Sequence, residues 1–177
     1  MALLKVHDKQ FKPFISAEQI NEHVKKVATQ INKDYIGKRP LFIVILNGAF
    51  MFASDLLKEI TIEAEICFIK LASYKGVTST GQVVTAIGLD VDLVGREVIV
   101  VEDIIDTGKT ISHFLPQIRY HHPASLKIAA LLHKPDAMVN PVKIDYLGFT
   151  VPDKFLIGYG LDYDGLGRNI KEIYQME

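Results

Sequence analysis

Apolar positions along the chain follow two spacings, one typical of helices and the other typical of buried strands. Between Ser16 and Gly37 they recur at helical intervals, at Ile20, Val24, Val27 and Ile31. This spacing predicts an amphipathic helix that runs to about Tyr35. Ser16 followed by Gln19 is a capping-box pattern for the start of this helix, and Gly37 is placed to end it.

Three apolar runs predict buried strands: LFIVIL at 41–46, which is uninterrupted and too short for a buried helix, VIVV at 98–101 and LKIAALL at 126–132. Helical patterns follow the first two runs, at 50–60 and 110–120. Continuous apolar runs are typical of the central strands of a parallel sheet that helices cover on both faces. We therefore predict the α/β fold class, with a central, mostly parallel sheet flanked by helices.

Length and composition fit an ordinary globular protein. The chain has 177 residues and no internal repeat or Pro/Gly-rich linker, so we predict a single domain over residues 1–177. Its formal net charge of -1 provides no overall basic field for nucleic acid or anionic membrane, and we expect neither partner. The single cysteine, Cys67, excludes an intrachain disulfide framework and lies in an apolar run, where we expect a core position.

The most hydrophobic stretch, residues 41–57, is shorter than the roughly 20 residues of a membrane helix. It also contains Asn47, Gly48, Ser54 and Asp55. The first residues lack a sustained apolar segment of the kind that signal peptides carry. We therefore expect no membrane association and a cytoplasmic location.

Polar or flexible residues follow the apolar runs at four places: 47–49, 73–76, 102–110 and 133–134. Ligands of parallel sheets gather where the carboxyl ends of the strands meet. We expect these segments to form one site.

The segment VIVVEDIIDTGKT at 98–110 carries the most chemical information. Glu102 and Asp103 are adjacent carboxylates at the predicted end of a buried strand, where they need cations, donors or water. A divalent metal ion suits them. Asp106 to Thr110 supply hydroxyls, a glycine and backbone N–H groups at the start of a helix, which together form a cradle for an anion such as phosphate. The alternative is a helix-capping turn beside solvated acids.

Two other nucleotide motifs fail at one position each. Gly108-Lys109-Thr110 resembles the end of a Walker A loop, but Asp103 stands where that loop has its first glycine. Gly158 and Gly160 resemble a dinucleotide fingerprint, but Tyr163 stands where the third glycine belongs.

The segment as a whole resembles the phosphoribosyl pyrophosphate signature of type I phosphoribosyltransferases. The resemblance extends over roughly residues 40–170, and Leu46-Asn47-Gly48, Ser73-Tyr74, Lys134 and the run at 152–168 are similar to hypoxanthine-guanine phosphoribosyltransferases in order and spacing. It implies a hood formed by terminal segments. It also implies a magnesium-dependent enzyme of purine salvage that transfers the 5-phosphoribosyl group from phosphoribosyl pyrophosphate to hypoxanthine and guanine, giving IMP or GMP and pyrophosphate.

The resemblance also implies roles for individual residues. Asp106 is the expected general base at the purine nitrogen. The phosphoribosyl group would be bound by Glu102, Asp103, Asp106, Thr107, Gly108, Lys109 and Thr110, and the pyrophosphate by Asn47, Gly48 and Arg168. The purine would be bound by Ile104, Lys134, Phe155, Leu156 and Asp162, with Lys134 favouring a 6-oxopurine and Phe155 stacking on the base. The expected magnesium ligands are Glu102, Asp103 and Asp162.

Two loops carry further features of the resemblance. Asn47 departs from the lysine usual in the family, and the family's peptide bond before this position can be cis without proline. Ser73 and Tyr74 begin a loop, residues 74–82, that in the family closes over the site. The alternative for this loop is a plain hairpin connection.

Two other functions share the predicted fold and stay open. One is a nucleic-acid-binding regulator that senses the same metabolites, and the other is a phosphoribosyltransferase for xanthine or a pyrimidine. None of the histidines pair at helical metal spacing, so we expect no zinc site. Because family members form dimers or tetramers, we expect a homodimer or homotetramer, with an apolar interface around residues 50–57.

Overall fold

A six-stranded sheet forms the centre of the molecule. The computed structural model describes residues 3–73, 83–87 and 89–177. The strand order is β5-β4-β3-β6-β7-β8, in which β5 is the antiparallel edge and the other five strands run parallel. The strands are β3 (Leu41–Leu46), β4 (Glu65–Ser73), β5 (Val83–Ile87), β6 (Glu97–Ile105), β7 (Ser125–His133) and β8 (Tyr146–Thr150). The predicted α/β class is confirmed.

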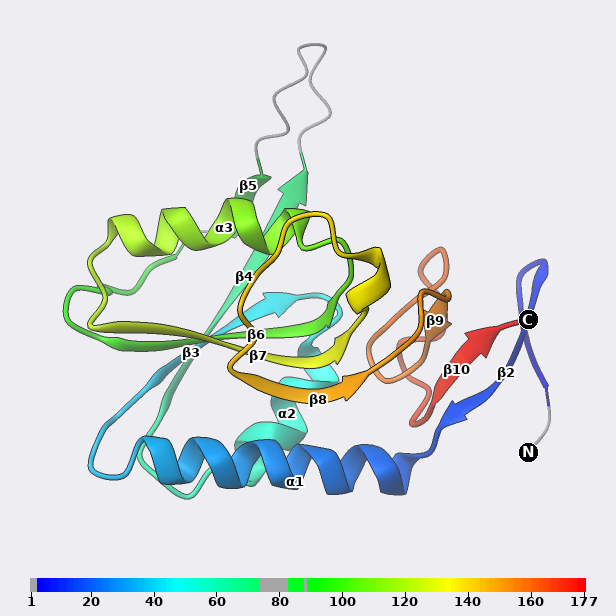
Figure 1. Cartoon of the computed structure of the whole chain (residues 1–177), viewed down its shortest axis with the longest axis horizontal. Coiled ribbons are helices and arrows are strands. Elements are labelled where there is room, and N and C mark those ends of the chain that lie inside the picture. The colour runs from blue at the N-terminus through cyan, green and yellow to red at the C-terminus, as the bar shows by residue number, and fades with distance from the viewer. Residues whose placement is uncertain (1–2, 74–82, 88) are drawn as a thin grey trace, which may run out of the picture.

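Helices cover both faces of this sheet. Helices α1 (Ala17–Asp34) and α2 (Phe50–Lys58) lie on one face and α3 (Lys109–Tyr120) lies on the other (Figure 1). Strand β3 shows why both faces are apolar, because Phe42 and Val44 pack in the core beneath α1 and α2, whereas Ile43 packs in the core beneath α3. Cys67 is half-buried at the edge of this second core. No helix in the described part of the chain is long and apolar enough to cross a membrane.

The predicted start of α1 is confirmed. Ser16 Oγ accepts a hydrogen bond from Gln19 N at 3.3 Å, and Gln19 Oε1 accepts one from Ser16 N at 2.9 Å. The helix ends with Tyr35 as its C-cap, and its buried residues include all four apolar residues of the predicted stripe.

The terminal segments form a second, smaller sheet. It contains β1 (Leu4–Val6), β2 (Lys9–Ile15), β9 (Leu156–Ile157) and β10 (Ile173–Met176) in the order β1-β2-β10-β9, all antiparallel. Figure 1 shows this sheet beyond the ends of β6 and β8, with the loop that follows β9 beside it. This is the hood that the resemblance implied, and the C-terminus lies on it (Figure 1).

Strand β6 is longer than its apolar run. It continues to Ile105 because its pairing with β7 continues to the contact between Ile105 and His133. Glu102 and Asp103 therefore lie within the strand, and the expectation that they follow it was wrong. Local hydrophobicity underestimated the strand because pairing with β7 keeps these two polar residues in the sheet.

Candidate active site

The turn between β6 and α3 encloses a small cavity. It has a volume of about 90 Å³, and its lining includes Glu102, Asp106, Thr107, Gly108 and Thr110. Gly108 is the N-cap of α3, with a φ of 74° that favours glycine, and Lys109 is the first helical residue. The free N–H groups at a helix start attract anions, so this turn has the features of the predicted phosphate cradle.

A second loop holds this cradle in place. The N–H groups of Val139 and Asn140 both donate to the carbonyl oxygen of Thr107, at 3.0 and 2.9 Å. A Cβ atom on Gly108 would lie 2.1 Å from the carbonyl oxygen of Asn140, so the two loops can meet only at a glycine. Sequence reasoning missed this support, because the Asn140-Pro141 pair indicates a turn but not its partner.

Glu102 and Asp103 form an acidic pair in which Glu102 is buried and Asp103 is half-buried. Glu102 is 8% exposed, and burial together with the neighbouring Asp103 carboxylate holds the pKa of Glu102 well above its usual range. Burial also raises the pKa of Asp103. Neither side chain takes part in a salt bridge within the described residues. Two carboxylates that the protein leaves without a cation are suitable oxygen ligands for a hard divalent ion.

Asp106 and Lys134 meet across the carboxyl ends of β6 and β7. Lys134 Nζ donates to Asp106 Oδ2 at 2.9 Å and lies 3.5 Å from Asp153 Oδ1. Lys134 is 6% exposed, whereas the Asp106 side chain is 44% exposed and accessible to a ligand. The contact thus brings together the predicted general base and the lysine predicted to bind the purine, which are 28 positions apart in the sequence.

The loop after β3 lies against the acidic pair. The peptide bond between Leu46 and Asn47 is cis, which is a form that the resemblance allows here. A Cβ atom on Gly48 would lie 1.7 Å from Asp103 Oδ2, so Gly48 is in close contact with the carboxylate. Asn47 itself is exposed.

The predicted purine side lies at the hood. Phe155 is 42% exposed, and its ring meets that of Tyr163 edge-on at 5.6 Å and 80°. Leu156 follows in β9, which pairs with β10. Ile104 lies on β6, where it pairs with Leu132, and is partly buried against the first core. An exposed aromatic ring with fixed neighbours is suited to stacking on a base.

Asp162 and Arg168 are bonded to each other. Arg168 Nη2 lies 2.6 Å from Asp162 Oδ1, and Arg168 Nη1 donates to the carbonyl oxygen of Gly160 at 2.7 Å. Asp162 Oδ2 also accepts the N–H of Gly165 at 2.8 Å. Within the described residues, Asp162 does not join Glu102 and Asp103 in a group of three metal-ligating side chains. The structure therefore separates the predicted metal ligands into a carboxylate pair and a distinct residue on the hood loop.

The predicted lid is only partly described. Ser73 ends β4, where its backbone pairs with Val83, and Tyr74 with the rest of the 74–82 loop lies outside the described residues.

Comparison with known proteins gives the class to which this fold and site belong. Residues 16–164 match the phosphoribosyl transferase domain family. The hypoxanthine-guanine phosphoribosyltransferase of Streptococcus pneumoniae R6 is 42% identical over 164 residues, which cover 92% of this chain and 91% of that protein. The chain therefore belongs to the phosphoribosyltransferase family.

Solved structures give a consistent result. A hypoxanthine-guanine phosphoribosyltransferase from Bacillus anthracis, with HEPES in its active site, superposes with a TM-score of 0.88 at 38% identity, covering 94% of this chain and 96% of that one. A Staphylococcus aureus hypoxanthine phosphoribosyltransferase gives 0.89 at 35% identity, covering 94% and 91%. The prediction of a purine-salvage transferase is thus confirmed, and the alternative of a nucleic-acid-binding regulator is not favoured.

Proposed function

We propose that the chain transfers the 5-phosphoribosyl group from phosphoribosyl pyrophosphate to hypoxanthine and guanine, releasing pyrophosphate. The relatives named above support this choice of purines. The observation that carries it is the contact between Asp106 and Lys134 beside the phosphate cradle. It combines a proton acceptor, a donor for the exocyclic oxygen of a purine and an anion site within one edge of the sheet.

The chemistry at the donor is a displacement at the anomeric carbon of the ribose. The N–H groups around Gly108 would bind the 5'-phosphate and so fix the ribose over β6. As pyrophosphate leaves, positive charge develops on the ribose, and the carboxylates of Glu102 and Asp103 would stabilise it. The N–H groups around Gly48 and the guanidinium of Arg168 would hold the pyrophosphate.

The purine must lose a proton as its nitrogen attacks the ribose. Asp106 is exposed enough to accept that proton, and Lys134 holds the carboxylate in place from the buried side. The ammonium group of Lys134 would also donate to the 6-oxo group, which favours hypoxanthine or guanine over adenine. Phe155 would stack on the base, while Ile104 and the carbonyl groups of Leu156 and Asp162 would complete the pocket.

Magnesium is the metal we propose for this site. The acidic pair of Glu102 and Asp103 fits it, because both supply oxygen ligands and lack a protein cation within the described residues. Asp162, which the resemblance implies as a further ligand, would have to exchange its contact with Arg168 or Gly165 for the metal. When bound, the metal would neutralise the negative charge of the donor.

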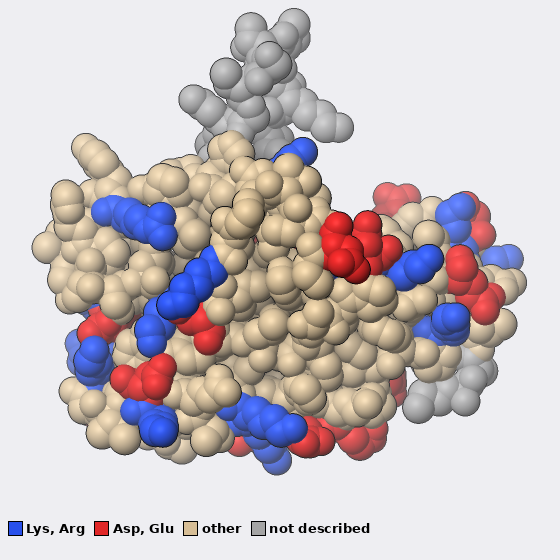
Figure 2. Space-filling model, in the orientation of Figure 1, with Lys and Arg blue, Asp and Glu red and all other residues tan. Residues whose placement is uncertain are grey.

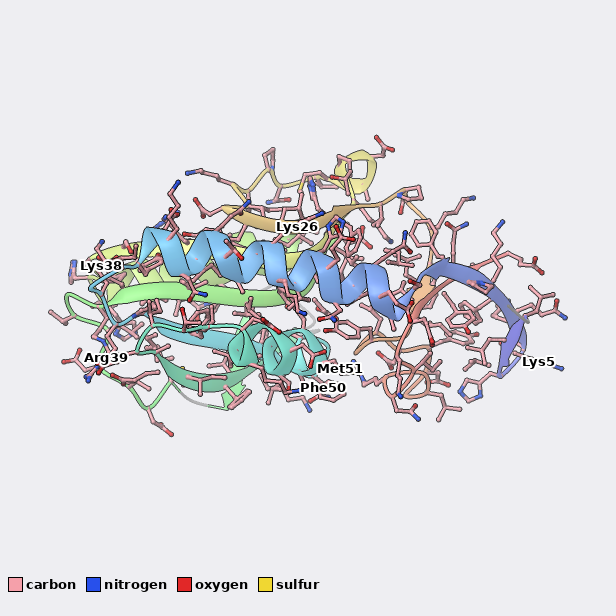
Figure 3. All side chains as sticks on the ribbon, turned by 90° about the horizontal axis from the view of Figure 1, so that it is seen from below. Lys5, Lys26, Lys38, Arg39, Phe50 and Met51 are labelled. Atoms are coloured by element: carbon pink, nitrogen blue, oxygen red, sulfur yellow. The ribbon has the colours of Figure 1, made fainter. Side chains whose placement is uncertain are left out.

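We also propose a cytoplasmic enzyme with small-molecule substrates that assembles as a homodimer or homotetramer. Acidic and basic side chains are interspersed over the face in Figure 2, which does not suit nucleic acid or an anionic membrane. Phe50 is 42% exposed at the start of α2 (Figure 3), within the segment that we expect at the interface. Light scattering coupled to size-exclusion chromatography would measure the assembly.

An ultraviolet assay tests the proposed function. The purified chain, with phosphoribosyl pyrophosphate and magnesium, is given hypoxanthine, guanine, xanthine, adenine or uracil. Turnover of hypoxanthine and guanine but not of adenine is expected. Exclusive turnover of xanthine or uracil would instead indicate a phosphoribosyltransferase for xanthine or a pyrimidine.

A matched pair of variants tests the general base. Asp106→Asn should lose about a hundredfold or more of turnover while still binding IMP, because general-base catalysis contributes about 10² to 10⁴. Asp153→Asn removes the other carboxylate near Lys134 and should lose little. Equal turnover in the two variants would contradict the role of Asp106.

A further inference from the structure

Tyr159 occupies the tip of a tight turn in an unusual conformation. Gly158 and Leu161 exchange two backbone hydrogen bonds, of 3.1 and 3.0 Å, around Tyr159 and Gly160, whose φ angles are 47° and 101°. Positive φ at both central residues is the feature of a hairpin turn that favours Asn and Gly, and a tyrosine there is uncommon. A bulky residue in this position needs interactions elsewhere that hold it.

The hydroxyl group of Tyr159 provides such an interaction. The residue is 4% exposed, and its hydroxyl donates to Asp55 Oδ2 at 2.7 Å. Asp55 lies on α2, and its other oxygen pairs with Lys58 at 2.9 Å. The bond therefore connects the hood loop to a helix that is 104 positions away in the sequence.

Helix α2 directly follows the loop that holds Gly48. Phe50 and Met51 are the first two residues of α2, and they lie at the end of the helix that is nearer the hood (Figure 3). The backbone between loop and helix is short and bonded, because Phe50 N donates to the carbonyl oxygen of Asn47 at 3.3 Å. A displacement of α2 would therefore move Gly48.

The tip of the turn also contacts that loop directly. A Cβ atom on Gly160 would lie 2.0 Å from the carbonyl oxygen of Gly48, so the two glycine backbones touch. Gly160 in turn bonds Arg168, donating its N–H to the Arg168 carbonyl oxygen at 3.0 Å and accepting Arg168 Nη1 at 2.7 Å. Contacts thus form a closed ring from Asp55 through α2, Gly48, Gly160 and Tyr159 back to Asp55.

We propose that Tyr159 and Asp55 are positioning residues for the pyrophosphate end of the donor. This inference rests on the proposed function, which assigns the pyrophosphate to the backbone around Gly48 and to Arg168. Neither Tyr159 nor Asp55 touches the donor. Their hydrogen bond sets the distance between the two groups that do.

Removal of the hydroxyl tests the proposal. In Tyr159→Phe, the KM and the calorimetric Kd for phosphoribosyl pyrophosphate should rise about tenfold, which is the order expected for loss of a hydrogen bond to a charged acceptor. The KM for hypoxanthine should stay within about twofold of the wild type, because Phe155 and Lys134 lie outside the ring of contacts. A merely structural role would lower thermal stability without separating the two KM values.

Tyr146→Phe is the matched control. Tyr146 is 3% exposed and its hydroxyl donates to Asp34 at 2.7 Å, but it lies at the opposite end of the sheet, where β8 begins. This variant should lose stability and keep the donor KM of the wild type. If both variants raise the donor KM equally, the effect is general loosening and the proposal is overturned.

Asp55 gives a second test that does not depend on Tyr159→Phe being folded. Asp55→Ala should weaken donor binding, and Asp55→Asn should recover most of it, because the amide oxygen still accepts the tyrosine hydroxyl. In the double variant Tyr159→Phe/Asp55→Ala, the donor KM should equal that of the single variants, because both remove the same bond.

The outcomes separate this inference from the proposed function. Unchanged donor KM values in Tyr159→Phe and Asp55→Ala, in a wild type that turns over hypoxanthine, would overturn the inference alone. A wild-type protein that binds no phosphoribosyl pyrophosphate would overturn both.

Discussion

The carboxylate of Asp103 lies against the backbone of Gly48, so closely that a Cβ atom on Gly48 would stand 1.7 Å from Asp103 Oδ2. Two segments that the resemblance assigns to different parts of the donor, the ribose and the pyrophosphate, are therefore in direct contact. Gly48 does not have a positive φ, so the position needs glycine for space and not for backbone conformation.

Gly48→Ala should therefore raise the KM for phosphoribosyl pyrophosphate by about tenfold or more, because the methyl group must displace Asp103 or the loop. Gly37→Ala is the control. Gly37 has a φ of 73° and open space around its Cβ position, so alanine there should lower stability and leave the donor KM unchanged. Steady-state kinetics with varied donor measures both, and an unchanged donor KM in Gly48→Ala would contradict the contact.

Lys134→Met should weaken discrimination between purines. The variant keeps an apolar stem in a position that is 6% exposed but removes the donor to the 6-oxo group, so kcat/KM for hypoxanthine should fall about tenfold to a hundredfold. Turnover of adenine should fall less or rise. Lys143→Met, at a side chain that is 86% exposed, is the control and should match the wild type. A parallel loss for both purines would mean that Lys134 acts only by holding Asp106.

Phe155→Leu should raise the KM for hypoxanthine about tenfold, since stacking of a base on an aromatic ring contributes about 1 to 3 kcal/mol. The donor KM and the thermal stability should change little, because the ring is 42% exposed. Phe14→Leu, at a phenylalanine of the hood that is 37% exposed, should leave the hypoxanthine KM alone. Equal effects of the two variants would argue against stacking.

Glu102→Gln should change how stability depends on pH in the absence of magnesium. The pKa of Glu102 is raised in the folded protein. The free energy of unfolding of the wild type therefore falls as pH rises from the ordinary glutamate pKa, near 4.3, through the raised pKa of the folded state. Within that window the variant should become progressively more stable relative to the wild type as pH rises. Urea unfolding between pH 4 and pH 8 measures the difference.

Glu97→Gln is the control for this prediction, and it has the opposite sign. Hydrogen bonds from Lys38 and Ser125 lower the pKa of Glu97, so its ionised form stabilises the fold above the ordinary glutamate pKa and this stability is lost as pH falls through the folded value. Glu97→Gln should therefore be less stable than the wild type at neutral pH, with the difference vanishing in acid. Identical pH profiles for the two variants would contradict the buried state of Glu102.

Features with a local cause could be predicted from the sequence. The Ser16 capping box and the run at 41–46 gave α1 and β3 nearly to the residue, because capping and hydrophobic spacing act over a few positions. The turn from Asp106 to Gly108 was found for the same reason. Its residues alone provide the N–H groups and the glycine.

Features that depend on distant pairing could not be predicted. The extension of β6 through Glu102 and Asp103 depends on β7, and the support of Thr107 depends on the loop at 138–140. The bond from Tyr159 to Asp55 joins a turn to a helix. In the sequence, the turn was considered only as a dinucleotide motif, which was rejected, and the helix was considered only as part of an interface. A single sequence contains no signal for such a pair.

Strand β10 has no side chain assigned to the site, yet it fixes the region where a base would stack. Met176 N donates to the carbonyl oxygen of Phe155 at 2.9 Å, and Gln175 pairs with Leu156. The phosphate cradle, on the far side of the site, is supported by the loop at 138–140 instead. Proteolytic trimming of Gln175 and Met176 would therefore loosen the region that holds the acceptor base, while the contacts that support the phosphate cradle would remain.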